Sequence, residues 1–286
     1  MDHACTPNPD RREFESSLKT DLKDEMTYAR YLKLDSLLSS QSPLSSPAHH
    51  DEMLFIIIHQ AGELWFKLMI HELRAAMAAI RTDDLGTSCK ILSRVKHVQS
   101  LLIHQWDVLA TLTPSEYTQF RDVLGSGSGF QSVQYRVVEF LMGNKDERMV
   151  QVHRHDPAAV ADLQRAIEEP SVYDEFLAYL ARHGFNVPDE VLTRDRTQPY
   201  ESHDGVIEVL KEIYTAPEKN WDAYEMAEKL VDVGEQFSLW RFRHMKVVER
   251  IIGYKTGTGG SSGVAFLRKM IDHRFFPELW TVRTHL

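Results

Sequence analysis

Residues 50–81 read HDEMLFIIIHQAGELWFKLMIHELRAAMAAIR. Apolar side chains recur in this segment every three or four residues, which is the spacing of an α-helix with one buried face. A proline- and serine-rich segment at residues 43–47 comes just before it and breaks any earlier helix. The pattern therefore predicts one long helix from about His50 to Arg81 at the centre of the fold.

The rest of the chain has the same helical spacing, and it contains no alternating run long enough to suggest a sheet. We therefore expect an all-α helical bundle with long central helices. Further helices are predicted over residues 26–41, over residues 87–112 and, as one helix or two in line, over residues 217–252. The motif Thr113-Pro114-Ser115-Glu116 supplies a capping hydroxyl, an early proline and a capping-box carboxylate, so another helix begins there.

Two glycine-rich segments separate the helices: the first glycine loop, residues 125–129, and the second glycine loop, residues 257–263. Helical spacing resumes over residues 130–142 after the first loop. Asp156-Pro157 and Pro170-Ser171 open two shorter helices. The sequence has neither an internal repeat nor a long linker, so we expect a disordered leader over residues 1–20 and a single helical domain over residues 21–286. An inserted helical lobe is expected at about residues 145–215.

Composition and charge exclude several classes of partner. Lys and Arg number 33 against 42 Asp and Glu, a net charge of −9, which has the wrong sign for neutralising nucleic-acid phosphates. Cys5 and Cys89 are too few for a disulfide framework, which favours the reducing cytoplasm. The first 20 residues lack the apolar run of a secretory signal. The longest apolar stretch, residues 53–62, is well short of the roughly 20 residues that a membrane helix requires, so we expect no membrane partner.

Two of the 14 histidines lie on apolar helix faces, where water would not satisfy them. His244 shares its face with Trp240, and His59 shares its face with Phe55. Gly62, one turn beyond His59, costs about 1 kcal/mol of helix propensity relative to Ala and leaves space beside the imidazole. A haem site needs one imidazole in an apolar slot and a polar group on the opposite side. The ordinary alternative for each residue is a core histidine bonded to backbone carbonyls.

Other sites are less well supported by the spacing of the residues. A di-iron bundle needs Glu followed three residues later by His, and no Glu in the chain meets that condition. His71-Glu72 begins like a zinc-protease helix, but the second histidine position holds Ala75. The second glycine loop lacks the lysine that follows a phosphate-binding loop, so it is either a mobile lid or a flexible connection. Arg121 is either a solvated helix residue or a fork for a carboxylate.

Several separated motifs, taken in order, resemble tryptophan 2,3-dioxygenases. They are TYARYL at 27–32 with LD at 34–35, HDEMLFII at 50–57 with HQ at 59–60 and ELW at 63–65, FRD at 120–122, SGFQS at 128–132, EFL at 139–141, LWRFRH at 239–244 and GTGGSSG at 257–263. The resemblance covers roughly residues 20–286.

The resemblance implies a reaction at ferrous haem b. Both atoms of O₂ would be inserted across the indole C2–C3 bond of L-tryptophan to give N-formylkynurenine, the first step of the kynurenine pathway. His244 matches the family's proximal iron ligand. Trp106, Ser128 and Gly129 match residues that contact the cofactor.

The resemblance also assigns roles in substrate binding. His59 matches the distal histidine that accepts a hydrogen bond from the indole N–H, and Phe55 matches an aromatic wall of the indole pocket. Arg121 matches the residue that pairs with the substrate carboxylate, and Tyr117 matches a hydroxyl close to that carboxylate. Thr258 matches a lid residue that contacts the amino-acid head group.

A homotetramer is implied as well, because Tyr28 and Tyr31 match residues that the family delivers from a neighbouring subunit. The chain departs from the family at Ile58 and at Ala61-Gly62, where polar or bulkier residues are common, and this bears on pocket size and affinity. Two other functions are open: a related haem oxygenase acting on another indole derivative, and a helical protein that binds haem or tryptophan without turnover. Arg121 and Thr258 favour tryptophan, because an indole without a carboxylate would not need them.

Overall fold

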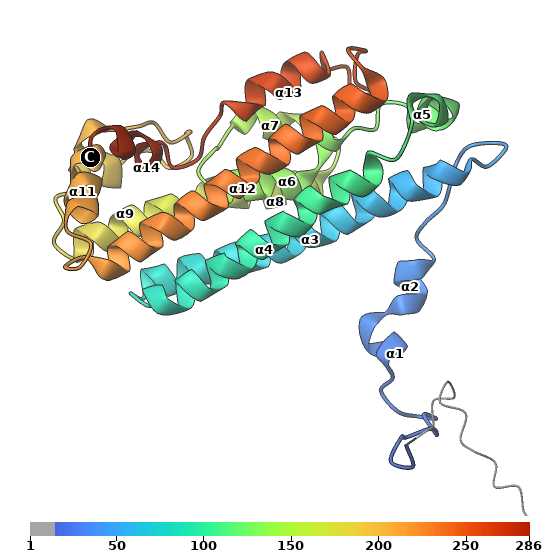
Figure 1. Ribbon diagram of the computed structural model, residues 1–286, viewed down its shortest axis with the longest axis horizontal. Coiled ribbons are helices and arrows are strands. Elements are labelled where there is room, and N and C mark those ends of the chain that lie inside the picture. The colour runs from blue at the N-terminus through green and yellow to red at the C-terminus, as the bar shows by residue number, and fades with distance from the viewer. Residues whose placement is uncertain (1–14) are drawn as a thin grey trace, which may run out of the picture. The chain divides into compact units, whose positions relative to one another are not determined.

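The computed structural model describes residues 15–286, in which every regular element is a helix and no strand occurs (Figure 1). This confirms the predicted all-α class. The chain divides into a first unit, up to Ser42, and a second unit, Pro43–Leu286. Most of the predicted leader, residues 1–14, lies outside the described residues.

The first unit contains two short helices, α1 (Tyr28–Leu32) and α2 (Leu34–Leu38). The single helix predicted over residues 26–41 is therefore wrong. Lys33 separates the two helices because its backbone takes the left-handed conformation, with φ of 55°. Within the described residues neither helix has a buried residue, so neither has a packed face of its own to hold a continuous helix together.

Three long helices of the second unit run side by side: α3 (His50–Arg81), α4 (Leu85–Leu109) and α12 (Trp221–Ile252). Helix α4 packs against both of the others (Figure 1). The predicted helix from His50 to Arg81 is confirmed. The helix predicted over residues 217–252 begins four residues later than expected, because Pro217 and the three residues after it form a turn before α12.

The segment between α4 and α12 begins with the predicted capping box. The backbone N–H of Thr113 donates to the Glu116 carboxylate over 2.7 Å, and the Glu116 N–H donates to the Thr113 hydroxyl over 3.4 Å. Helices then follow on both sides of the first glycine loop: α5 (Pro114–Phe120), η1 (Arg121–Leu124), η2 (Gly129–Gln131) and α6 (Val133–Leu141).

Shorter helices occupy the rest of the chain. The segment expected to form the lobe contains α7 (Glu147–Val152), α8 (Pro157–Glu168), α9 (Val172–Arg182), α10 (Asp189–Leu192) and α11 (Asp204–Thr215). After the second glycine loop come α13 (Val264–Ile271), α14 (Pro277–Thr281) and η3 (Val282–Thr284). The predicted starts at Asp156-Pro157 and Ser171 are confirmed, whereas α7, α10, α11, α13 and α14 were not predicted.

Helix α3 is long and apolar enough, by length and composition alone, to cross a membrane. A core helix of a globular protein meets the same two criteria. In the second unit α3 packs against α4, α6 and α9, and its fully buried side chains include Met69, Leu73 and Ile80. These contacts account for the buried apolar side chains of α3, whereas Ile57 and Leu64 of the same helix are exposed.

Candidate active site

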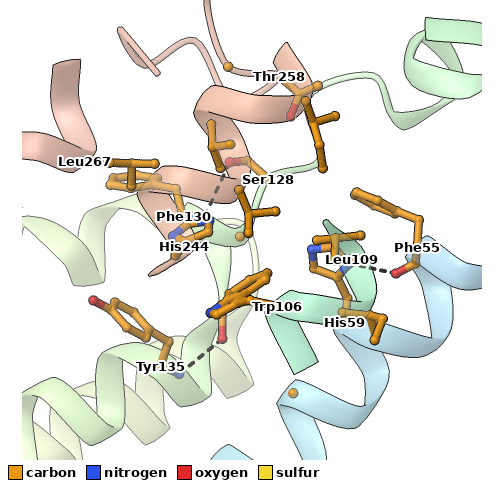
Figure 2. A pocket seen from close by; sticks show the side chains of 18 of the residues that line it. Phe55, His59, Trp106, Leu109, Ser128, Phe130, Tyr135, His244, Thr258 and Leu267 are labelled. Carbon is orange, nitrogen blue, oxygen red and sulfur yellow. Dashed lines mark hydrogen bonds between the residues drawn. The ribbon is translucent and has the colours of Figure 1, made fainter. Parts of the chain in front are cut away.

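A cavity of about 260 Å³ lies where α3, α4 and α12 meet the two glycine loops and α13. Its walls are mainly aromatic and aliphatic, and Figure 2 shows His59 and His244 on two sides of it with Trp106 between them. The cavity therefore brings together the two histidines that the sequence singled out, although they lie 185 positions apart along the chain.

His59 is fixed by a hydrogen bond inside α3. Its Nδ1 lies 2.7 Å from the carbonyl oxygen of Phe55, and the two rings pack with centroids 4.2 Å apart. Because a carbonyl only accepts, Nδ1 carries the proton and Nε2 keeps its lone pair. Burial lowers the pKa of His59, an effect partly offset by the Phe55 carbonyl and by Glu63. His59 is therefore a neutral acceptor at physiological pH.

His244 has a different environment. Its ring stacks on Trp106, with centroids 4.7 Å apart and planes 17° from parallel, and on Trp240 at 5.5 Å. It forms no hydrogen bond with any residue in 15–286, and burial lowers its pKa to about 4. A neutral imidazole in an apolar, aromatic slot is what a haem iron requires of its proximal ligand. The residues present therefore fit a haem.

The space expected beside His59 at Gly62 is bounded by Gln105. A Cβ atom at Gly62 would lie 3.1 Å from Nε2 of Gln105, which reaches across from α4. Gly62 and His59 nevertheless line the same cavity, so the predicted space beside the imidazole is present, although the Gln105 carboxamide lies where a side chain at residue 62 would begin. Gly62 also permits close packing of α3 against α4, and Gln105 lines the cavity as well.

Arg121 lies beside the cavity without lining it. Its Nη2 donates to the carbonyl oxygen of Thr256 over 2.7 Å, and its buried Nε has no partner within the described residues. Tyr117, one turn earlier, does line the cavity; burial raises the pKa of its phenol and the nearby Arg121 charge lowers it. The structure thus places Arg121 next to Tyr117 and to the start of the second glycine loop.

The two glycine loops contact each other at the mouth of the cavity. The Thr258 hydroxyl donates to the carbonyl oxygen of Gly127 over 2.5 Å. A Cβ at Gly259 would come within 2.8 Å of the Ser128 Cβ, so only glycine allows this approach. The second glycine loop therefore closes over the first, as a lid would.

Comparison with known proteins agrees with this geometry. The family model described as tryptophan 2,3-dioxygenase matches residues 13–167 and 205–286. The chain belongs to the tryptophan 2,3-dioxygenase family. It is 58% identical to the tryptophan 2,3-dioxygenase of Serratia proteamaculans (strain 568) over 96% of this chain and 99% of that protein. It is 57% identical to the tryptophan 2,3-dioxygenase of Myxococcus xanthus (strain DK1622), over 98% and 97% of the two chains.

Family membership makes the chain an oxidoreductase, a tryptophan dioxygenase, and it does not favour an oxygenase of another indole derivative. Most of the predicted site residues of this tryptophan dioxygenase line the one cavity: Phe55, His59, Trp106, Tyr117, Ser128, Gly129, His244 and Thr258. Tyr28 and Tyr31 do not. They belong to the first unit, where both side chains are about three-quarters exposed, at 77% and 75%.

Sequence reasoning missed a polar group in the wall of the dioxygenase cavity. Tyr135, Arg136 and Arg241 line it, and all three belong to a buried network centred on Glu139. One signal was present in the sequence, because Arg241 precedes His244 by three residues and so lies on the same side of α12. The sequence did not show that a carboxylate from another helix would meet it.

Proposed function

We propose that the chain binds haem b through His244 and catalyses insertion of both atoms of O₂ across the indole C2–C3 bond of L-tryptophan, giving N-formylkynurenine. The observation that carries this proposal is the pairing of His59 and His244 in one aromatic cavity. One imidazole is stacked and has no hydrogen bond within the described residues, and the other is locked as an acceptor.

The cofactor would be held by residues of the cavity wall. His244 would supply the iron ligand, and Trp106, Ser128 and Gly129 would contact the macrocycle. Arg136 lines the same cavity, and its buried Nε has no partner within the described residues, so it is the cationic group suited to a carboxylate of haem. Haem, when bound in its ferrous form, supplies the iron at which O₂ is activated.

His59 would orient the indole. With Nδ1–H donated to Phe55, its Nε2 can accept the indole N–H and fix which edge of the ring is presented. Phe55 and the side chains around it exclude water, so this single hydrogen bond counts for more than it would in solvent. The lowered pKa of His59 keeps the acceptor available.

The amino-acid head group would be recognised at the mouth of the cavity. Arg121 is the group for the substrate carboxylate, with Tyr117 beside it and Thr258 on the lid. A guanidinium can hold a carboxylate with two parallel bonds, which is selective for the amino acid over an indole without a carboxylate. Because Arg121 also donates to the Thr256 carbonyl, the same side chain would bind the substrate carboxylate and hold the start of the lid.

We propose that the enzyme is a homotetramer in which Tyr28 and Tyr31 reach a neighbouring active site. Their exposure supports this, as do exposed apolar side chains on all three long helices, at Ile57, Leu64, Leu101, Val108, Leu239 and Phe242. Ile57 and Leu64, seven residues apart, lie on one face of α3, as Leu101 and Val108 do on α4, and a continuous apolar face is unusual on a monomer. Light scattering should give a tetramer. Deleting residues 1–31 should impair both assembly and turnover, and a monomeric truncation with wild-type kinetics would remove the proposal.

The proposed compartment is the cytoplasm. Cys89 is the one cysteine among the described residues, and it is free and buried. Burial raises the pKa of its thiol to about 11, so it is protonated and unreactive at neutral pH. A protein that does not rely on disulfides suits a reducing compartment.

The proposed domain organisation is one helical domain with an inserted lobe at about residues 145–215. Its support is the family match, which runs up to residue 167 and resumes at 205. The unmatched segment between them contains α9 and α10, within the proposed lobe.

The reaction is tested with purified full-length protein. A haem Soret band should be present, and L-tryptophan with a reductant in air should yield N-formylkynurenine. With isotopically heavy O₂, both heavy atoms should appear in one product molecule. Haem binding without turnover would support a binding protein instead, and a product containing one heavy atom would exclude dioxygenase chemistry.

A further inference from the structure

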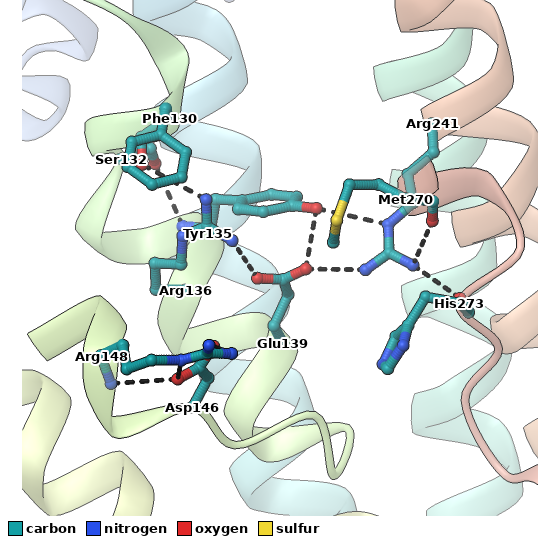
Figure 3. Close-up of polar contacts among 10 residues, drawn as sticks. All are labelled: Phe130, Ser132, Tyr135, Arg136, Glu139, Asp146, Arg148, Arg241, Met270 and His273. Atoms are coloured by element: carbon teal, nitrogen blue, oxygen red, sulfur yellow. Dashed lines mark hydrogen bonds and ion pairs between the residues drawn. The ribbon is translucent and has the colours of Figure 1, made fainter. Parts of the chain in front are cut away.

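A buried polar cluster lies between the helices that carry the cavity wall. Figure 3 shows Glu139 of α6 at its centre, between Arg136 on one side and Arg241 of α12 on the other. The side chains of Glu139 and Arg241 are only 2% and 4% exposed. Burying three ionisable groups is costly unless they satisfy one another, so the geometry of this cluster is expected to be strict.

Glu139 is shared by three donors. Its Oε2 accepts from Nη1 of Arg136 over 2.5 Å, and its Oε1 accepts from Nη2 of Arg241 over 2.7 Å. The Tyr135 hydroxyl donates to the same Oε1 over 2.9 Å. Burial and the Glu139 charge raise the pKa of Tyr135 to about 12, so the phenol keeps its proton and remains a donor. Both carboxylate oxygens are thus engaged.

Arg241 continues the network to a third element. Its Nη1 donates to the carbonyl oxygens of Met270, over 3.3 Å, and His273, over 2.8 Å. These carbonyls lie at and just beyond the C-terminal end of α13, where helix carbonyls have no partner of their own. Arg241 therefore caps α13 from α12, while Glu139 holds Arg241 in place (Figure 3).

Helix α13 is part of the cavity wall. Phe266, Leu267 and Met270 line the cavity, and the second glycine loop leads directly into the helix. The position of α13 therefore sets both the width of the cavity beside His244 and where the lid is anchored. His244 itself lies three residues after Arg241 on α12.

We propose that Glu139 is a positioning residue of the dioxygenase: by fixing Arg241, it holds the capped end of α13 in register with the helix that carries His244. The proposal rests on the proposed function. Neutralising Glu139 would leave Arg136 and Arg241 as two buried cations without their shared anion, and Arg241 would no longer be held against the α13 carbonyls.

The first test is Glu139→Gln, which keeps the side-chain shape and removes the charge. Hydrogen exchange of the α13 amides, residues 264–271, should become at least about tenfold faster, as expected when a charge-assisted bond is lost. Exchange of α4 should not change. The Michaelis constant for L-tryptophan should rise by about tenfold, with a smaller change in kcat, because α13 and the lid complete the pocket.

A second variant keeps the proposal testable if Glu139→Gln does not fold. Arg241→Lys retains the charge beside Glu139, but an ammonium cannot reproduce the fork that meets both Met270 and His273. It should also loosen α13 and raise the Michaelis constant. The matched control is Arg148→Gln, because Arg148 is 87% exposed and pairs with Asp146 outside this network. Its exchange and kinetics should equal those of wild type.

Two results would overturn the proposal. If the Michaelis constant rises while α13 exchange stays at the wild-type rate, Glu139 affects substrate binding by another route and not through α13. If exchange accelerates equally in α4 and α13, Glu139 stabilises the whole domain. Failure of the proposed function is separate, because it would appear as absent turnover in the wild type, whereas the exchange comparison needs no turnover.

Discussion

Nδ1 of His59 lies 2.7 Å from the carbonyl oxygen of Phe55, one helical turn earlier in α3. This bond decides which ring nitrogen faces the cavity as an acceptor. It leaves Nε2 without a proton, as an indole N–H requires of its partner. His59 can therefore orient the substrate without changing its own protonation state.

Replacing His59 with Ala should leave haem content unchanged and slow turnover of L-tryptophan by about tenfold, the value of one buried hydrogen bond. The comparison substrate is 1-methyltryptophan, which has no N–H to donate. In wild type it should be turned over more slowly than tryptophan, and the ratio of the two rates should be smaller in the variant. An equal ratio in both enzymes would show that His59 does not contact the indole nitrogen.

The pH dependence of kcat/KM should reflect the lowered pKa of His59. Protonation of Nε2 would abolish the acceptor, and burial makes this protonation harder than in water, where the pKa is 6.5. Activity should therefore persist as the pH falls through 6.5 and decline only below it. A decline in wild type with a midpoint at or above 6.5 that is absent from His59→Ala would contradict the assignment.

His244→Ala should abolish stable haem binding while leaving the helical circular dichroism intact, because no second histidine shares that face of α12. Added imidazole should partly restore the Soret band. His104→Ala is the control, because His104 is an exposed histidine of α4 bonded to the Ser100 carbonyl. Full haem occupancy in His244→Ala would refute the proximal role.

Arg121→Lys should raise the Michaelis constant for L-tryptophan by about ten- to a hundred-fold, because an ammonium cannot make the two parallel bonds of a guanidinium. Tryptamine has no carboxylate, so its Michaelis constant should rise far less. Some loss is expected for both substrates, since Arg121 also holds the Thr256 carbonyl at the lid. Equal losses would mean that the residue acts only through the lid.

Glu278→Gln should flatten the dependence of stability on pH. Glu278 of α14 is fully buried, and its carboxylate accepts from Tyr173, Tyr200 and the His203 backbone over 2.7 to 3.1 Å. Burial raises its pKa above 4.5, so the native state keeps its proton longer than the unfolded state. Stability from this group is present below pH 4.5 and is lost as the pH rises through the folded pKa.

Thermal unfolding of the two proteins across that range tests this prediction. Wild type should lose stability relative to Glu278→Gln as the pH rises from about 4.5, because a Gln side chain keeps most of the bonds and does not ionise. A wild-type advantage that grows with pH would show that the carboxylate is ionised in the native state and that its three donors outweigh its burial.

Capping residues and apolar periodicity correctly predicted several helices of the second unit. The Thr113 capping box and the apolar stripe from His50 to Arg81 depend on neighbours within one helix, and both are confirmed. The helix over residues 26–41 failed for the opposite reason. Neither α1 nor α2 has a buried residue, and the left-handed conformation of Lys33 divides the stripe.

The sequence predicted the apolar residues and the histidines of the cavity, but it did not predict the polar part of the wall. His59 and His244 stand out because each lies on an apolar helix face. The Glu139 network depends on contacts between α6, α12 and α13, and the last of these helices was not predicted. Spacing along one helix cannot reveal a carboxylate supplied by another.

The contact between Gly62 and Gln105 couples two positions that lie on different helices. A Cβ at residue 62 would approach the Gln105 amide to 3.1 Å, so a larger side chain there requires a smaller or reoriented residue at 105. Relatives with a bulkier residue at the position of Gly62 should therefore have a reoriented or a different side chain at the position of Gln105. A redesign of the pocket at residue 62 therefore has to include the conformation of Gln105.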